Sequence, residues 1–170
     1  MTARDIQRRI IWDGYRRNFV LPNYTPIGWF ECDVFELTKA GFFREYEIKI
    51  SRSDFVADAK KLRQRWEDGW KPPEKKHDLL ANQHLRGPSR FYFCTPEGLI
   101  CRTMIPDWAG WITFSHQPNR SFPWSVHPYI ERQAPVLHRC KALPELRSRA
   151  LESVYWRFHT LLSERLKCAA

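Results

Sequence analysis

The sequence lacks the motifs that most easily identify zinc sites and membrane segments. None of its five cysteines belongs to a CxxC pair, and its six histidines form neither an HExxH motif nor a Cys/His cluster with zinc-ligand spacing. No stretch approaches the roughly 20 apolar residues of a membrane helix, and the first residues include no apolar segment of signal-peptide length. We therefore expect no structural zinc, no membrane association and a cytoplasmic location.

The cysteines are also unsuited to a disulfide framework. They are odd in number and widely separated, at positions 32, 94, 101, 140 and 168, which favours a reducing compartment. There is no internal repeat and no low-complexity segment. The chain has 170 residues, of which 43% are hydrophobic, so residues 1–170 are predicted to form a single domain around one core.

The charge balance is strongly basic. Twenty-eight Lys and Arg residues against 19 Asp and Glu give a formal net charge of +9, and the sequence pI is about 9.6. A polyanionic partner such as nucleic acid is consistent with this excess. Many basic proteins have no such partner, so the charge only supports an interpretation that rests on other residues.

Two acidic segments joined by a short turn, residues 29–37 and 42–50, are the most informative part of the sequence. Both alternate in the manner of strands, and Gly41 suits the left-handed position of a three-residue hairpin loop. Residues whose numbers sum to about 80 should then lie opposite each other. In this register Asp33 faces Glu47, while Glu31 faces Lys49.

Directly opposed carboxylates are unfavourable unless a positive charge lies between them. A divalent cation is the usual solution, and a donor set made only of oxygens suits Mg²⁺ or Mn²⁺. The alternative is a solvated sheet face on which acids and lysines alternate. Several large apolar residues flank the same face and argue against that alternative: Trp29, Phe35, Leu37 and Phe43.

An Asp on one strand followed by Glu-x-Lys on the next, here Asp33 and Glu47-Ile48-Lys49, resembles the catalytic core of the PD-(D/E)XK nuclease superfamily. The similarity extends over roughly residues 29–115, with a weaker match at 134–138. Within the superfamily, the sequence resembles the subgroup described as MmcB-like DNA-repair proteins. The matching segments are residues 47–55, Lys60-Lys61, Lys76-His77, residues 90–93, Pro96 and residues 105–110.

This resemblance implies an α/β fold of the restriction-endonuclease-like type, with a mixed central sheet flanked by helices and an αβββαβ core. It also implies a Mg²⁺ or Mn²⁺ ion held by Asp33, Glu47 and the backbone carbonyl of Ile48. Lys49 would orient the attacking water and stabilise charge on the phosphate. The implied function is Mg²⁺-dependent hydrolysis of DNA in repair, recombination or phage DNA metabolism. The alternative is a non-catalytic nucleic-acid-binding accessory protein that keeps the fold.

Several other residues have more than one candidate role. Cys32 replaces the Pro of the superfamily pattern, and the sequence does not decide whether a helix acid, Asp5 or Asp13, completes the site. Glu31 could support the metal ligands, bind metal itself or pair with Lys49, and pairing with Lys49 is the expected role. Ser51 and Asp54 either support the site or cap a helix. Four basic residues could contact the DNA backbone or could simply be solvated: Lys60, Lys61, Lys76 and His77. A homodimer or a partner protein is also possible.

The remaining pattern predicts alternating helices and strands. Helices are expected over residues 3–17, from Ser51 through Trp66 to Gly69, in part of 74–86, and over 143–166. Strands are expected at 91–94 and 109–114, extended chain at 129–139, and loops at 22–26 and 116–128.

Overall fold

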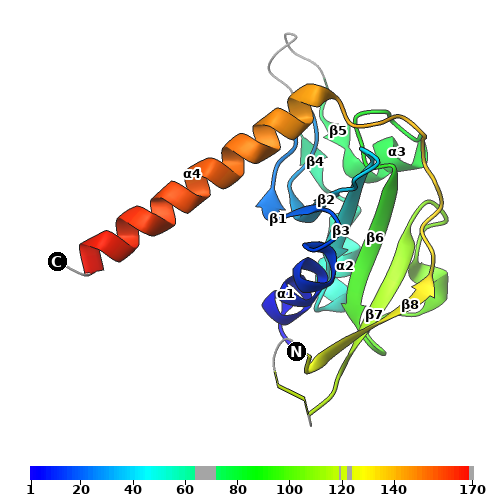
Figure 1. Cartoon of the computed structure of the whole chain (residues 1–170). Helices are drawn as coiled ribbons and strands as arrows, with labels where there is room; N and C mark the ends of the chain where they lie inside the picture. The colour runs from blue at the N-terminus through cyan, green and yellow to red at the C-terminus, as the bar shows by residue number, and fades with distance from the viewer. Residues whose placement is uncertain (64–71, 119, 122–123, 169–170) are drawn as a thin grey trace.

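The fold is a six-stranded mixed sheet flanked by helices, seen in a computed structural model that describes residues 1–63, 72–118, 120–121 and 124–168 (Figure 1). The strand order is β1-β2-β3-β6-β7-β8. These strands span Phe19–Tyr24, Cys32–Leu37, Phe43–Ile48, Arg90–Pro96, Gly110–His116 and Val126–Arg132. The helices are α1 (Ala3–Gly14), α2 (Arg52–Asp58), α3 (Lys76–Ala81) and α4 (Pro144–Cys168), with a 3-10 turn at Arg102–Met104. Two short strands, β4 (Leu62–Arg63) and β5 (Glu74–Lys75), pair separately.

The sheet combines antiparallel and parallel pairs. β1, β2 and β3 form an antiparallel meander, β6 runs parallel to β3 and β7 parallel to β6, and β8 returns antiparallel. The predicted mixed α/β architecture is therefore confirmed. The hairpin register is confirmed too, because Val34 pairs with Tyr46 and Phe35 with Glu45. Gly41 has φ of 86°, as its expected position in the turn requires.

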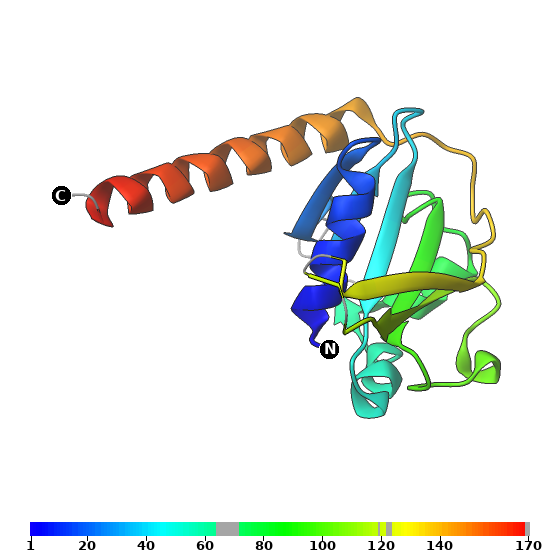
Figure 2. The same cartoon turned by 60° about the horizontal axis from the view of Figure 1, so that its bottom comes forward.

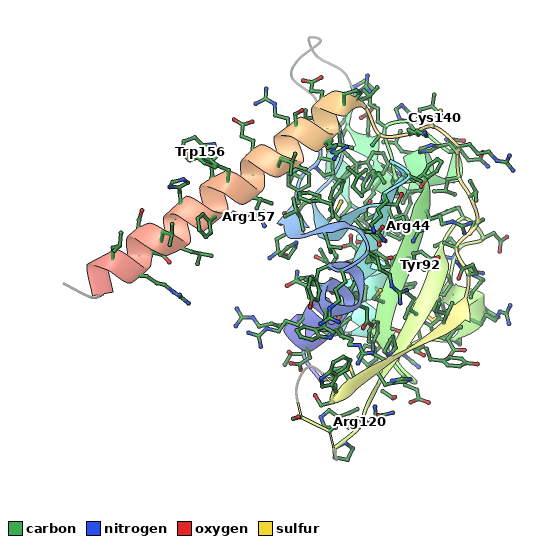
Figure 3. The ribbon with its side chains drawn as sticks, in the orientation of Figure 1. Arg44, Tyr92, Arg120, Cys140, Trp156 and Arg157 are labelled. Carbon is green, nitrogen blue, oxygen red and sulfur yellow. The ribbon has the colours of Figure 1, made fainter. Side chains whose placement is uncertain are left out.

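The two faces of the sheet carry separate apolar clusters. Figure 2 shows α1 lying along one face, where Ile6 packs among strand residues that include Val34, Ile48 and Tyr92. Arg44 and Tyr92 are labelled on this part of the sheet in Figure 3. The opposite face carries the larger cluster, dominated by aromatic side chains: Trp29, Phe35, Phe43, Phe91, Phe93 and Trp111.

The prediction of a loop at residues 22–26 was partly wrong, because β1 extends through Pro22 to Tyr24. Pro22 is tolerated because β1 is the edge strand of the sheet. The next residue, Asn23, has a positive φ of 47°. Near this irregularity Cys32 packs in the same cluster as Phe35, and not on the opposite face as strict alternation predicted.

The helix after the hairpin is shorter than expected. It ends at Asp58, and the chain turns through hydrogen bonds from Lys60 N to Ala57 O and from Lys61 N to Asp58 O. Leu62 then pairs with Lys75 in the small sheet. The predicted helical positions at Trp66 and Gly69 lie outside the described residues. The last strand also begins earlier than expected, at Val126.

The C-terminal helix was predicted correctly. Its first turns join the body, since Leu146 packs against the aromatic cluster and Ala150 is fully buried. The rest of α4 projects away from the sheet (Figure 1). None of the helices within the described ranges is long and apolar enough to cross a membrane.

Candidate functional site

Strand β3 places three ionisable side chains on the aromatic face of the sheet. Because side chains alternate along a strand, Glu45, Glu47 and Lys49 share a face. They are 0%, 1% and 4% exposed. Ionised groups are rarely buried to this extent without close partners of opposite charge, so their neighbours decide how the site is stabilised.

Glu47 is surrounded by lysines. Its Oε1 lies 2.9 Å from Lys49 Nζ and 2.5 Å from Lys61 Nζ, and its Oε2 lies 2.6 Å from Lys76 Nζ. Burial alone would raise the pKa of Glu47, but the charges of the lysines, Lys76 first, outweigh it and lower the pKa. Glu47 is therefore ionised at neutral pH.

Lys76 also holds Glu45. The Lys76 Nζ lies 2.6 Å from Glu45 Oε1, and the indole Nε1 of Trp29 donates to Glu45 Oε2 at 2.7 Å. Burial raises the pKa of Glu45 despite these partners. For Lys76 the order is reversed: burial would lower its pKa, but the neighbouring carboxylates raise it well above the usual value. A fully buried ammonium thus bridges two buried carboxylates.

Asp58, in the last turn of α2, closes the group from the other side. Its Oδ1 lies 2.8 Å from Lys49 Nζ and 3.3 Å from Lys61 Nζ, and its Oδ2 lies 2.8 Å from His77 Nε2. Burial opposes ionisation, but the hydrogen bond with His77 and the charges of Lys76 and Lys49 hold the pKa of Asp58 far below its usual value. We call the following seven residues the ionic cluster: Glu45, Glu47, Lys49, Asp58, Lys61, Lys76 and His77.

Asp33 lies beside the ionic cluster, near the end of β3. Its Oδ2 accepts a hydrogen bond of 2.7 Å from the backbone amide of Ile48. Burial raises the pKa of Asp33, and the charge of Glu47 raises it further. In an extended strand the N–H and C=O of one residue point to the same side, so the Ile48 carbonyl faces the edge on which Asp33 lies. The predicted residues Asp33, Glu47, Ile48 and Lys49 are therefore neighbours.

The ion pair predicted between Glu31 and Lys49 was wrong. Glu31 is exposed, and the carboxylates within reach of Lys49 Nζ are Glu47, Asp58 and, at 3.7 Å, Asp54. Pairing of β2 with β3 extends only as far as Val34, so the chain at Glu31 has left the register on which the prediction rested.

Ser51 acts as a helix cap. Its hydroxyl accepts a hydrogen bond of 3.1 Å from the backbone amide of Asp54 at the start of α2. The capping alternative for Ser51 is therefore confirmed. Asp54 lies in the first turn of the same helix and remains about half exposed, 3.7 Å from Lys49.

The basic residues predicted to contact DNA lie in different environments. Lys60 is exposed, whereas the side chain of Lys61 is 40% exposed and that of His77 is 17% exposed. Lys76 is fully buried with both its carboxylate partners. The prediction that Lys76 contacts the DNA backbone is corrected, because burial between two carboxylates keeps its ammonium from the surface.

The two helix acids left open by the sequence have local partners. Asp5 closes a capping box with Thr2 at the start of α1, and its pKa is lowered, first by the hydrogen bond from the Thr2 backbone. Asp13 accepts from Arg9 one turn earlier, at 2.8 Å. These contacts stabilise α1 and do not link either acid to the ionic cluster.

The carboxylates of the site are compensated by Lys49, Lys61 and Lys76, whereas the sequence prediction assigned Lys61 and Lys76 to DNA contacts. Among the residues that the structure describes, no group of three or more His, Cys, Asp or Glu side chains could hold a metal ion. Asp33, Glu47 and Ile48 contribute oxygen atoms, the ligand type that Mg²⁺ prefers, but lysines already contact both carboxylate oxygens of Glu47. Lys61 is the most exposed of the three lysines on Glu47.

Sequence reasoning missed Asp58 as a member of the site. Glu45 could have been assigned, because alternation places it on the face of Glu47 and Lys49. Asp58 is brought there by the turn between β3 and α2, and no local pattern indicates this. Two cavities, of about 620 and 490 Å³, lie near the start of α4 and are not lined by the ionic cluster or Asp33.

Comparisons with known proteins bear on the fold. No family model matches the chain, and no curated protein matches it. Among solved structures, it is similar to a protein of unknown function from Silicibacter pomeroyi, with a TM-score of 0.53 and 20% sequence identity. The match covers 96% of this chain and 85% of that chain. At this level of identity the similarity extends to the fold alone.

Proposed function

We propose that the chain is a Mg²⁺-dependent DNA nuclease of the PD-(D/E)XK type, with Asp33, Glu47 and Lys49 as its catalytic residues. The observation that carries the proposal is the meeting of Asp33 with Glu47-Ile48-Lys49 at one end of β3. The succession of α1, three antiparallel strands and α2, followed after β4, β5 and α3 by the parallel strand β6, is consistent with the αβββαβ core of that superfamily with an insertion before its last strand. The net charge of +9 suits a polyanionic substrate.

Asp33, Glu47 and the Ile48 carbonyl would hold the cation. When bound, Mg²⁺ supplies Lewis-acid activation of water and of the phosphate. The raised pKa of Asp33 supports this assignment, because a carboxyl that is costly to ionise in the isolated protein would gain from a nearby cation. A bound cation would replace the contact of Lys61 with Glu47, since Lys61 is the most exposed of the lysines on Glu47.

Lys49 acts as a fixed positive charge in this proposal. Its pKa is raised by Glu47 and Asp58, despite the opposing effect of burial, so it stays protonated at neutral pH and is not a general base. Its ammonium is held between Glu47 Oε1 and Asp58 Oδ1, at 2.9 and 2.8 Å. A positioned ammonium of this kind stabilises negative charge that develops on a phosphate without having to reorganise during the reaction.

A second candidate is a non-catalytic nucleic-acid-binding protein with the same fold. It is favoured by one observation, the engagement of both Glu47 oxygens by lysines. The lysine ammonium groups already supply the positive charge that the Glu47 carboxylate requires, so the arrangement is stable without a metal ion.

The test is cleavage of single-stranded, duplex and flapped DNA with Mg²⁺ or Mn²⁺, comparing the parent with Asp33→Asn and Glu47→Gln. Glu152→Gln serves as a control, because Glu152 lies on the exposed part of α4. Cleavage by the parent and the control, lost in both site variants, supports the nuclease. Undiminished cleavage by folded Asp33→Asn contradicts the site assignment. Binding without cleavage by the parent favours the second candidate.

A further inference from the structure

The projecting part of α4 carries an apolar stripe that the described part of the chain leaves exposed. Residues spaced three and four apart share a helix face, and seven large side chains follow this spacing. They are between 37% and 72% exposed: Leu151, Val154, Tyr155, Phe158, Leu161, Leu162 and Leu166. We call these residues the α4 stripe. Continuous apolar surface of this kind is unusual on a protein that remains a monomer.

The body of the protein contacts a different side of the helix. Leu146 and Ala150 pack against the core, and Arg157 donates to the backbone oxygens of Pro22 and Asn23 at 2.6 Å. These positions also follow helical spacing; they lie about a third of a turn from the centre of the stripe and adjoin one of its flanks. Figure 3 shows Arg157 directed toward β1 and Trp156 on another side of α4. The contact with the body therefore fixes the direction of α4 and leaves the stripe open.

We infer that two copies of this chain associate by packing their α4 stripes against each other in antiparallel orientation. A stable interface buries roughly 800 Å² per partner. Tyr155 and Phe158 have roughly 150–250 Å² of surface each. With the five smaller aliphatic side chains, all seven being between 37% and 72% exposed, the stripe offers roughly several hundred Å² per partner, which approaches that size. The spacing of three and four residues over two heptads is that of helices that pack side by side.

The charge and bulk of the body favour the antiparallel orientation. The body contacts the N-terminal turns of α4, and the chain has a net charge of +9. A parallel pair would bring two positively charged bodies together at one end. An antiparallel pair of these 25-residue helices holds the bodies at opposite ends, roughly 37 Å apart along the axis, and also opposes the two helix dipoles favourably.

The first test is the mass of the full chain in solution, by light scattering and sedimentation velocity over a wide range of concentration. We expect a dimer for the parent and, for Phe158→Glu/Leu162→Glu, a rise in Kd of at least roughly a hundredfold. Trp156→Glu is the matched control, because Trp156 is 61% exposed but lies off the stripe, and it should remain dimeric. Far-UV circular dichroism checks that each variant is folded.

A parent that is monomeric at every concentration would overturn the inference. So would a dimer that survives Phe158→Glu/Leu162→Glu, or one that is lost in Trp156→Glu while its helix content is unchanged. These readouts do not depend on nuclease activity, so the dimer and the proposed function succeed or fail separately.

Cross-linking tests the orientation. In a background with Cys101, Cys140 and Cys168 replaced by serine, Leu151→Cys and Leu166→Cys chains are mixed and oxidised. The antiparallel pair predicts a disulfide between the two different chains, because Leu151 and Leu166 lie at opposite ends of the α4 stripe. A disulfide between two chains that both carry Leu166→Cys would overturn the antiparallel arrangement.

Discussion

The ionic cluster and the α4 stripe depart in opposite directions from the usual distribution of side chains. In the cluster, Glu47 is 1% exposed and Lys76 is 0% exposed, whereas in the stripe Phe158 is 56% exposed and Leu166 is 72% exposed. Charged residues are almost never fully buried without partners. The cluster meets this requirement within one chain, through ion pairs of 2.5 to 2.9 Å on Glu47. The stripe has no such partners among the described residues, and in the proposed dimer a second chain would supply them.

The ionic cluster and the α4 stripe also contribute to stability in different ways. Buried ion pairs add little net stability relative to apolar residues of the same size, but removing one partner is strongly destabilising. The cluster is therefore a device that fixes the positions of Lys49 and Glu47. Apolar burial on the stripe would contribute directly to association, because it removes exposed surface from water.

The largest effect should come from breaking the cluster at Lys76. Lys76→Met keeps the length of the side chain but leaves Glu45 and Glu47 without their shared ammonium. We expect the free energy of unfolding to fall by about 3–5 kcal/mol, measured by urea denaturation.

The matched control is Lys60→Met, since Lys60 is exposed and its loss should change stability by less than about 0.5 kcal/mol. Equal effects of the two substitutions would show that Lys76 is not a buried bridge. Because the α4 stripe has no buried charge, Trp156→Glu and Phe158→Glu/Leu162→Glu should leave the unfolding of the monomeric body almost unchanged.

A smaller effect is expected from pH. The folded-state pKa values of Asp58 and Glu47 are lowered by their hydrogen bonds and cationic neighbours. The stability they contribute is present above their unfolded-state pKa, near 4, and is lost as the pH falls through that value toward the folded-state pKa. We therefore expect the denaturation midpoint of the parent to decrease between neutral pH and pH of about 3.

Asp58→Asn tests which group is responsible. The variant is less stable at neutral pH, because Asp58 no longer pairs with Lys49 and Lys61, so the slope of stability with pH is the quantity to compare. Each unit of pKa difference contributes about 1.4 kcal/mol. A slope in Asp58→Asn as steep as that of the parent would show that other carboxylates govern the acid transition.

The parts of the structure that follow from local pattern were predicted well. Alternation and Gly41 predicted the β2–β3 register, and residue spacing predicted α1 and α4. These features depend on neighbours in sequence. The path of β1 through Pro22 was missed, because the tolerance for proline depends on the strand's position at the sheet edge, which only the assembled sheet defines.

For the candidate site, the residues that lie together were predicted better than the contacts they make. The proximity of Asp33, Glu47 and Lys49 follows from one hairpin, so it could be read from sequence. The lysines on Glu47 could not, because Lys61 and Lys76 return to β3 from segments beyond α2 and from the start of α3. Opposed acids predicted a cation at this place, but its identity depends on long-range contacts.

The smallest effect is expected for Asp33→Asn. This substitution tests whether a metal ion or the lysines of the ionic cluster supply the positive charge that the opposed carboxylates require. Burial and Glu47 raise the folded-state pKa of Asp33, so ionised Asp33 lowers stability as the pH rises through that value. Asparagine keeps an oxygen that can accept from the Ile48 amide and removes the charge. We expect a gain of up to about 1 kcal/mol at neutral pH, which disappears in acid where Asp33 is protonated in both states.

Under the proposed function, the same substitution should also abolish the stabilisation that Mg²⁺ gives to the parent, because a cation that binds only the folded protein raises its melting temperature. Thermal unfolding of the parent and Asp33→Asn, each with and without Mg²⁺, measures both effects. If Mg²⁺ raises the melting temperatures of the two proteins equally, Asp33 is not a ligand. The lysines of the ionic cluster would then be the cations that the opposed carboxylates require.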